Sequence, residues 1–145
     1  MKALIQRVSA ASVDVDGARV GQISAGLLVF LGIDKPDDIE AVHRLAEKVM
    51  NYRIFGDEQG KMNCSLFETG GEMLVVSQFT LSADTQKGLR PSFTSAADPE
   101  SARSLYESFV EVCRQQISCV EIGQFGAEMQ VSLTNDGPVT FMLET

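Results

Sequence analysis

Histidine, cysteine and tryptophan are scarce in this chain: its 145 residues include one histidine, three cysteines and no tryptophan. A Ser-His-Asp triad needs a histidine base and a histidine-rich zinc site needs several ligands, so a lone His43 argues against both. The cysteines, Cys64, Cys113 and Cys119, have no metal-ligand spacing and cannot all pair, which is typical of reduced, packed thiols. We therefore expect no metal and no cofactor, and a structural role for His43 in a predicted helix.

Long apolar runs are also lacking. The longest, residues 27–31, is far too short to span a bilayer, which takes about 20 apolar residues. Near the start of the chain, Gln6 and Arg7 interrupt the apolar stretch that a signal peptide would need. These absences predict a cytoplasmic protein that does not bind membranes.

Positive charge is the third shortage. The chain has 12 Lys and Arg residues against 20 Asp and Glu residues, a formal net charge of −8. A protein that binds the phosphate backbone broadly, as on DNA, needs a basic surface. Recognition of one nucleotide at the end of an RNA chain relies on stacking and a few contacts, so the charge does not exclude it.

The pattern of apolar residues and turns predicts a single domain over residues 1–145 with more strands than helices. Asp16-Gly17 is a turn signal between the two strands of a hairpin. The continuous apolar run at residues 26–33 is typical of a strand buried on both faces. Further strands are expected at residues 2–9, 53–55, 72–78, 127–134 and 139–143.

Two helices are expected. Asp37 and Glu40 form a capping-box pattern at the start of the first, and Asp98 with Pro99 is a typical start for the second. The first helix has apolar residues on one face at helical spacing: Ile39, Val42, Leu45, Ala46 and Val49. Residues 82–97 lack periodicity and predict an irregular connection. The fold class is therefore α+β, with a curled, mainly antiparallel, barrel-like sheet over two helices.

Two short segments interrupt strands whose patterns are otherwise strong. Ser77-Gln78-Phe79-Thr80-Leu81 ends an apolar stretch with polar groups, and Asn135-Asp136-Gly137-Pro138-Val139-Thr140 places Gly-Pro where a strand is expected. Proline lacks the N–H that a central strand needs, and an interior glycine weakens a strand. Such breaks beside strong strands indicate function or strain.

The residue types of the first segment leave three interpretations open. Thr80 could be a nucleophile, but a nucleophile needs an activating base and none is near in the sequence. Backbone N–H groups at the strand end could instead stabilise a developing oxyanion. The third interpretation is a capped strand end with satisfied hydroxyl groups, and the residues alone favour it.

Together the two segments resemble the signature pair of the D-aminoacyl-tRNA deacylases. The similarity covers the whole chain and includes Ile5-Gln6-Arg7-Val8-Ser9, Gly88-Leu89-Arg90-Pro91-Ser92-Phe93 and Phe125-Gly126-Ala127-Glu128-Met129. The resemblance implies an ester hydrolase that releases a free D-amino acid, and also glycine, from the terminal adenosine of tRNA. It also implies a homodimer that binds the 3′ end of aminoacyl-tRNA and works without a metal.

The resemblance implies a role for each residue of the first segment. The backbone amides of Phe79 and Thr80 would face the ester carbonyl, with Ser77 and Gln78 shaping the same strand end. A ribose hydroxyl next to the ester would position or activate the attacking water, so the protein would not need a strong base.

Further residues are implied in substrate selection. Phe125 and Met129 would hold the adenine, although Met129 also fits the inward face of its strand. Gly137-Pro138, as a cis peptide supplied by the other subunit, would be a wall that excludes L side chains but not D side chains or glycine. Arg7 would fix that loop, although it could equally be an ordinary surface charge.

Two other functions are alternatives to the hydrolysis of D-aminoacyl-tRNA. One is an editing domain that removes L-serine from threonyl-tRNA, but such domains belong to larger synthetases and lack the Gly-Pro pairing. The other is a non-catalytic module that binds tRNA ends, which the intact pair of segments argues against. In each tRNA-binding hypothesis, Lys87, Arg90 and Arg53 are candidates for phosphate contacts or are solvated surface charges.

Overall fold

Strands outnumber helices in the described residues, 1–86 and 88–145 of a computed structural model. The strands are β1 (Lys2–Val15), β2 (Ala18–Ile23), β3 (Gly26–Gly32), β4 (Phe55–Gly56), β5 (Met62–Cys64), β6 (Glu72–Ser77), β7 (Val120–Ile122) and β8 (Gln130–Glu144). The helices are α1 (Ile39–Asn51), α2 (Leu66–Thr69), α3 (Pro99–Arg114) and the 3-10 helix η1 (Phe79–Ser82). Lys87, an expected phosphate contact, lies outside the described residues.

One curled sheet organises the chain. Its strand order is β2-β1-β3-β6-β7, and β8 pairs with the other edge of β1. β1 is antiparallel to β2, β3 and β8, whereas β6 is parallel to β3 and β7. The sheet curls until β2 approaches β7: a Cβ on Gly21 would lie 2.5 Å from the carbonyl oxygen of Ile122, so only glycine fits. The predicted α+β class with a mainly antiparallel, barrel-like sheet is confirmed.

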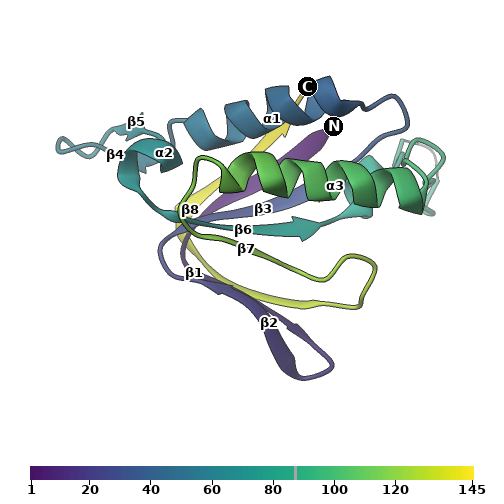
Figure 1. Cartoon of the computed structure of the whole chain (residues 1–145), viewed down its shortest axis with the longest axis horizontal. Coiled ribbons are helices and arrows are strands. Elements are labelled where there is room, and N and C mark those ends of the chain that lie inside the picture. Colours follow the sequence, from purple (N-terminus) through teal and green to yellow (C-terminus); the bar gives the residue numbers. More distant parts are fainter. Residues whose placement is uncertain (87) are drawn as a thin grey trace.

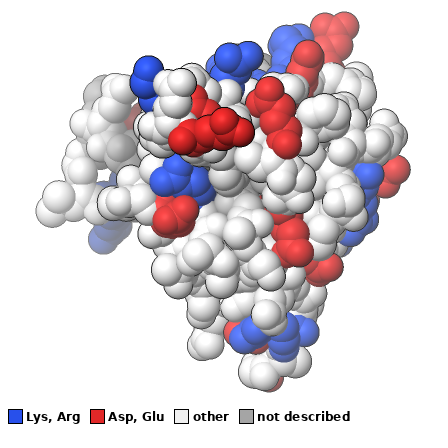
Figure 2. Space-filling view, turned by 90° about the vertical axis from the view of Figure 1, so that its left-hand side faces the viewer, with Lys and Arg blue, Asp and Glu red and all other residues white. Residues whose placement is uncertain are grey.

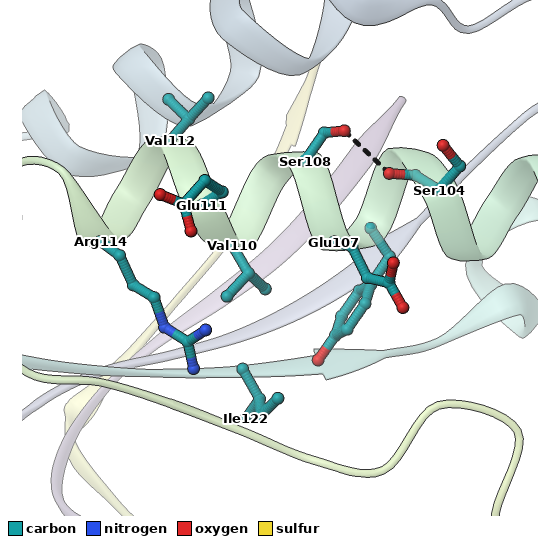
Figure 3. Close-up of a pocket in the computed structure, with 9 residues that line it drawn as sticks. Ser104, Glu107, Ser108, Val110, Glu111, Val112, Arg114 and Ile122 are labelled. Atoms are coloured by element: carbon teal, nitrogen blue, oxygen red, sulfur yellow. Dashed lines mark hydrogen bonds between the residues drawn. The ribbon is translucent and has the colours of Figure 1, made fainter.

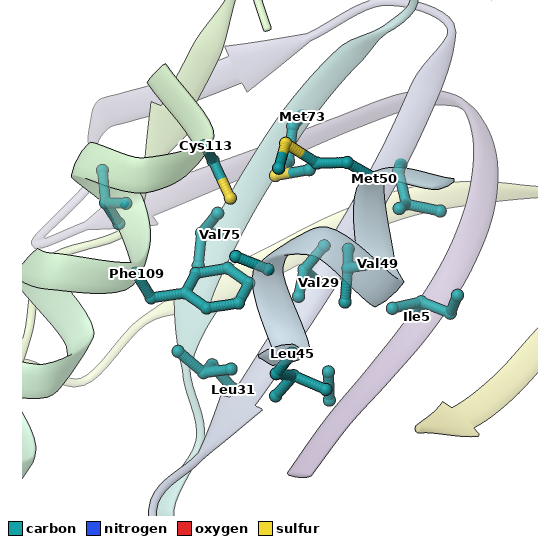
Figure 4. Packing of buried hydrophobic residues seen from close by; sticks show 14 of the residues in the cluster. Ile5, Val29, Leu31, Leu45, Val49, Met50, Met73, Val75, Phe109 and Cys113 are labelled. Atoms are coloured by element: carbon teal, nitrogen blue, oxygen red, sulfur yellow. The ribbon is translucent and has the colours of Figure 1, made fainter. Parts of the chain in front are cut away.

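A hydrophobic core lies on each face of the sheet. α1 and α3 cover one face (Figure 1) and enclose the larger core, in which their side chains pack with those of the central strands, as Phe109, Leu45 and Val75 do in Figure 4. The smaller core fills the inside of the curl and consists of Val8, Ala11, Val13, Val15, Ile23, Leu28, Leu74 and Val76. None of the described helices is long and apolar enough to cross a membrane.

Several local predictions are confirmed. β1 and β2 form a hairpin in which both turn residues, Asp16 and Gly17, have positive φ, as a tight hairpin turn requires. β3 is buried at every residue except Phe30, which is partly buried. The side chain of Asp98 accepts hydrogen bonds from the N–H groups at the start of α3, and Pro99 is the first helical residue.

Other local predictions are wrong at the boundaries. The expected strand at residues 2–9 and the first strand of the expected hairpin are the single strand β1, whose first half pairs with β3 and whose second half pairs with β2. The two expected C-terminal strands are likewise the single strand β8, which begins at Gln130 and pairs with β1 both before and after residues 136–139. A third helix, the one-turn α2, was not predicted; Ser65 and Glu68 form its capping box.

The start of α1 also differs from the prediction. Its N-cap is Asp38, whose side chain accepts a hydrogen bond from the N–H of Ala41. The expected cap, Asp37, instead binds the terminal ammonium of Met1 at 2.5 Å and the N–H of Asp34 at 2.6 Å. Ile39, expected on the buried face, is half exposed, so the buried stripe of α1 begins at Ala41.

Candidate active site

The first signature segment lies where β6 ends. The N–H of Gln78 continues the pairing with β3 by donating to the carbonyl of Leu31 at 2.8 Å, and the chain then turns into η1. The first hydrogen bond of η1 runs from the N–H of Leu81 to the carbonyl of Gln78 at 3.2 Å. The N–H groups of Phe79 and Thr80 therefore have no partner within this helix, as at any helix start.

Thr80 lies exposed beside this strand end. Its hydroxyl oxygen accepts a hydrogen bond from the side-chain amide of Gln78 at 2.5 Å. An amide nitrogen cannot take a proton from a hydroxyl, so this contact does not activate Thr80. The one histidine of the chain, His43, is exposed on α1 and is not among the residues that line the neighbouring pocket.

A pocket of about 480 Å³ opens at the end of β6. It brings together residues from both sets that the sequence suggested, the strand-end set and the adenine-binding set. These are Ser77, Gln78, Phe79, Phe125 and Met129, joined by Pro99 and Ala102 of α3. Segments about fifty residues apart in the chain thus share one cavity, which is the usual form of a small-ligand site.

Phe125 is held in place by α3. It lies in a turn closed by a hydrogen bond from the N–H of Ala127 to the carbonyl of Gln124 at 3.2 Å. Its ring lies 5.7 Å from that of Tyr106, centroid to centroid, and the guanidinium carbon of Arg103 lies 4.8 Å from its centroid. The aromatic contact with Tyr106 fixes the ring at the pocket wall, and the guanidinium of Arg103 lies within cation–π distance of the ring.

The side chain of Met129 packs against the backbone at Gly123, where there is room only because Gly123 has no side chain. A Cβ at Gly123 would lie 2.7 Å from the sulfur of Met129, so any other residue there would displace that side chain. Met129 also packs against the smaller core, as its inward spacing suggested.

The carbonyl of Val75 joins the three elements that form the pocket. It accepts hydrogen bonds from the hydroxyl of Tyr106 at 2.9 Å and from the N–H of Gly123 at 3.0 Å. The Tyr106 side chain is buried, and this burial raises the pKa of its hydroxyl, which stays a proton donor. β6, α3 and the turn before β8 are thereby tied together two residues before Ser77.

The second signature segment forms a bulge in β8. Residues 136–139 lie opposite the single residue Arg7 of β1, since Asn135 pairs with Val8 and Thr140 with Gln6. The Gly137–Pro138 peptide bond is cis, and Gly137 has a φ of +140°, a conformation that favours glycine.

Arg7 and Asn135 hold this bulge. Arg7 donates to the carbonyl of Asp136 at 3.0 Å and to that of Ile54 at 2.6 Å, and it lies 3.3 Å from the carboxylate of Asp136. The side-chain oxygen of Asn135 accepts from the N–H of Val139 at 3.0 Å. Arg7 is thus a bound, mostly buried side chain rather than a solvated surface charge.

Within one chain the two signature segments lie apart. The bulge lies opposite Arg7 of β1, and Arg7 pairs with Leu27 of β3. Leu27 in turn pairs with Met73 of β6, which lies four residues before Ser77. β8 is also three strands away from β6. Ordinary strand geometry then puts about 13 Å along the strands and about 14 Å across them between Gly137–Pro138 and the pocket.

A second cavity, of about 560 Å³, lies along the outer side of α3 next to Ile122 of β7 (Figure 3). Its charged side chains are Glu107, Glu111 and Arg114, and the hydrogen bond drawn in Figure 3 is a helical one from Ser108 to the carbonyl of Ser104. It contains none of the residues that the sequence suggested. We therefore place the candidate site at the end of β6.

The thiols do not belong to this site. Cys113 is fully buried in the larger core, and burial raises its pKa to about 12. Burial and the nearby carboxylates of Glu72 and Glu121 raise the pKa of Cys119. Among the described residues, neither Cys64 nor the other cysteines line the pocket, and no group of three or more His, Cys, Asp or Glu side chains could hold a metal ion.

Charged side chains are distributed rather than concentrated. On the face shown in Figure 2, acidic and basic groups are interspersed among the described residues. Arg53 and Arg90, expected as phosphate contacts, are both exposed, and Arg90 lines a small cavity within its own loop. Sequence reasoning missed Tyr106, Arg103 and Gly123, which do not line the pocket but contact Phe125 or Met129 in its wall. The helical spacing of Tyr106 and Phe109 could have identified the first.

Comparisons with known proteins agree on one family. The family model described as D-Tyr-tRNA(Tyr) deacylase matches residues 4–144. A protein of Shewanella denitrificans named D-aminoacyl-tRNA deacylase is 62% identical over 99% of both chains, and one of Teredinibacter turnerae with the same name is 60% identical over 100% of both. A solved structure named c-Myc DNA Unwinding Element Binding Protein is 42% identical, with a TM-score of 0.96 over 100% of this chain and 99% of that one.

The hydrogen bond from Tyr106 to Val75 should stabilise the fold measurably. Tyr106→Phe keeps the ring and removes this buried bond, so the free energy of unfolding should fall by about 0.5–1.5 kcal/mol. Tyr52→Phe is the matched control, because the Tyr52 hydroxyl has no hydrogen-bond partner among the described residues. Urea unfolding of both variants checks this. Equal midpoints would show that the hydroxyl of Tyr106 contributes nothing.

Proposed function

The chain belongs to the D-Tyr-tRNA(Tyr) deacylase family, and we propose that it hydrolyses the ester between a D-amino acid and the terminal adenosine of tRNA. The products are the free D-amino acid and tRNA, and glycine attached to tRNA is released in the same way. The observation that carries this proposal is the shared pocket of Ser77, Gln78, Phe79, Phe125 and Met129. We place the reaction in the cytoplasm, where tRNAs are charged.

The terminal adenosine occupies the side of the pocket formed by Phe125 and Met129. Aromatic rings bind unpaired bases of RNA by stacking, and a methionine side chain adapts to a flat ring. Because Tyr106 fixes the ring of Phe125, this wall is ready before the substrate binds. The ester of the adenosine then lies toward the other wall, at the end of β6.

The backbone amides of Phe79 and Thr80 bind the ester carbonyl. Their N–H groups have no partner within η1, and an oxyanion that develops during hydrolysis would accept hydrogen bonds from them. Ser77 and Gln78 shape the strand end, and the contact from Gln78 to the hydroxyl of Thr80 stabilises the turn. In this mechanism Thr80 contributes its backbone rather than a nucleophilic hydroxyl.

The attacking water is positioned or activated by the 2′-hydroxyl of the substrate. His43 does not line the pocket, and the hydroxyl of Thr80 is bonded to an amide, so the described residues offer no strong base at this strand end. A neighbouring ribose hydroxyl is present in every aminoacyl-tRNA. Catalysis by the substrate's own hydroxyl explains how a site of backbone donors can suffice.

Gly137 and Pro138 exclude L-amino acids from this site. A rigid backbone wall against the Cα of the substrate leaves no room for an L side chain, whereas a D side chain points away and glycine has none. Arg7 and Asn135 supply the rigidity through their hydrogen bonds to the bulge. Discrimination by exclusion is compatible with many different D side chains.

This wall has to come from a second copy of the chain. In one chain the bulge lies about 13 Å along and about 14 Å across the sheet from the end of β6, too far to touch the same amino acid. Among the described residues, β8 pairs only with β1, so one edge of this long strand has no partner, and Leu133 and Met142 are exposed on it. In a two-fold homodimer that covers this region, each copy would supply Gly137–Pro138 to the pocket of the other copy.

Two other functions fit fewer of the observations. The editing of L-serine from threonyl-tRNA would require a site open to L side chains, in conflict with the proposed wall. The name of the 42% identical structure refers to DNA binding, but a net charge of −8 argues against broad contact with a duplex. A module that only binds tRNA ends would use the same pocket and would show no turnover.

The stereochemistry of the substrate is the first test. Purified protein should hydrolyse D-tyrosyl-tRNA, whereas L-tyrosyl-tRNA should react on the order of 100-fold more slowly because its side chain meets the wall. Release of labelled tyrosine from each ester measures both rates. Hydrolysis of neither ester, with retained tRNA binding, would support a binding module and contradict the proposal.

Substrate-assisted catalysis predicts that the substrate's hydroxyl matters more than that of Thr80. A tRNA ending in 2′-deoxyadenosine and charged on its 3′-hydroxyl should lose about 100-fold or more in single-turnover rate. Thr80→Val retains the backbone N–H and should stay within about 10-fold of wild type. If Thr80→Val is inactive while the deoxy substrate still reacts, Thr80 is the nucleophile.

If each copy supplies the Gly137–Pro138 wall to the other copy's pocket, activity requires a dimer. Light scattering should give twice the chain mass of 15.7 kDa. Specific activity toward D-tyrosyl-tRNA should fall on dilution in step with dissociation, because the wall that orients the substrate is lost with the partner. A stable monomer with full activity and full D-over-L preference would contradict a wall supplied by the second copy.

A further inference from the structure

The guanidinium of Arg103 adjoins the wall of the pocket. The guanidinium carbon of Arg103 lies 4.8 Å from the centre of the Phe125 ring, and Phe125 and the neighbouring Ala102 both line the pocket. Arg103 is exposed on α3. Sequence reasoning gave no role to this residue.

The charge of Arg103 is unpaired among the described residues. No carboxylate oxygen lies within 4 Å of it, although Glu100 and Glu107 are on the same helix. Four other cations do have such partners: Lys2, Arg7, Arg19 and Arg44 pair with Asp34, Asp136, Asp14 and Glu40. An anion that binds Arg103 therefore displaces no existing ion pair.

We propose that Arg103 binds the phosphate that links the terminal adenosine to the preceding nucleotide. This proposal rests on the proposed function, in which the adenine is held against Phe125. A 3′-terminal nucleotide carries its one phosphate on the same ribose, close to the base. The cation nearest the base-binding ring is then the one best placed to meet that phosphate.

The chemistry of arginine suits this position. A guanidinium lies flat on an aromatic ring and still directs N–H groups outward from its edge, where they can bind two phosphate oxygens. A lysine in the same place would offer a point charge without this stacking. In a chain with a net charge of −8, one such local contact offsets the repulsion that the anionic end of tRNA meets.

The test compares substrates with and without the phosphate. Arg103→Met should raise KM for D-tyrosyl-tRNA about five-fold with kcat unchanged, and it should make the salt slope of log kcat/KM less negative by about 0.7, the value for one phosphate contact on a single strand. With 3′-O-D-tyrosyl-adenosine, which has no phosphate, Arg103→Met and wild type should have the same kcat/KM. Arg103→Lys should restore part of the affinity for tRNA.

Arg114→Met is the matched control, since it removes the same charge at the other end of α3. It should leave both substrates unaffected. An equal loss of Arg103→Met on both substrates would show that Arg103 acts through the ring of Phe125, and no loss on either would show that it has no role; both results overturn this inference. Inactivity of the wild type on D-tyrosyl-tRNA would instead reject the proposed function itself.

Discussion

The carbonyl oxygen of Val75 is the point on which the candidate site depends. It accepts one hydrogen bond from Tyr106 of α3 and one from Gly123, where the chain leaves β7. Those two bonds set the end of β6, the helix beside it and the turn that carries Phe125 relative to one another. Because a buried carbonyl is costly to leave unpaired, the arrangement resists loosening, and the pocket exists before any substrate arrives.

The curled sheet explains why one chain holds both signature segments but does not bring them together. β1 is long enough to pair with β3 and β2 along one edge and with β8 along the other. The bulge of β8 consequently lies three strands from β6, apart from the pocket at the end of β6. In the proposed reaction, catalysis at the end of β6 and selection by the bulge of β8 therefore use separate parts of one chain. Assembly of two copies would bring these parts together.

The proposed chemistry fits a chain with few reactive side chains. Backbone amides provide the donors, the substrate provides the hydroxyl, and a bulge provides the selection, so no histidine, metal or activated thiol is needed at the pocket. Recognition of the tRNA end would likewise use an aromatic ring and a neighbouring guanidinium rather than a broad basic surface. An acidic protein can bind an anionic polymer in this way when the contact is confined to one end of that polymer.

The sequence by itself determined the fold class and the two signature segments. Periodicity identified the buried strand β3 and the helix that starts at Asp98, because these follow from local spacing and capping. It did not reveal that residues 2–16 form one strand, that Asp38 rather than Asp37 caps α1, or that Tyr106 and Gly123 share the carbonyl of Val75. Those features depend on partners far along the chain, as Asp37 is engaged by the ammonium of Met1, and only the tertiary structure brings such partners within hydrogen-bonding distance.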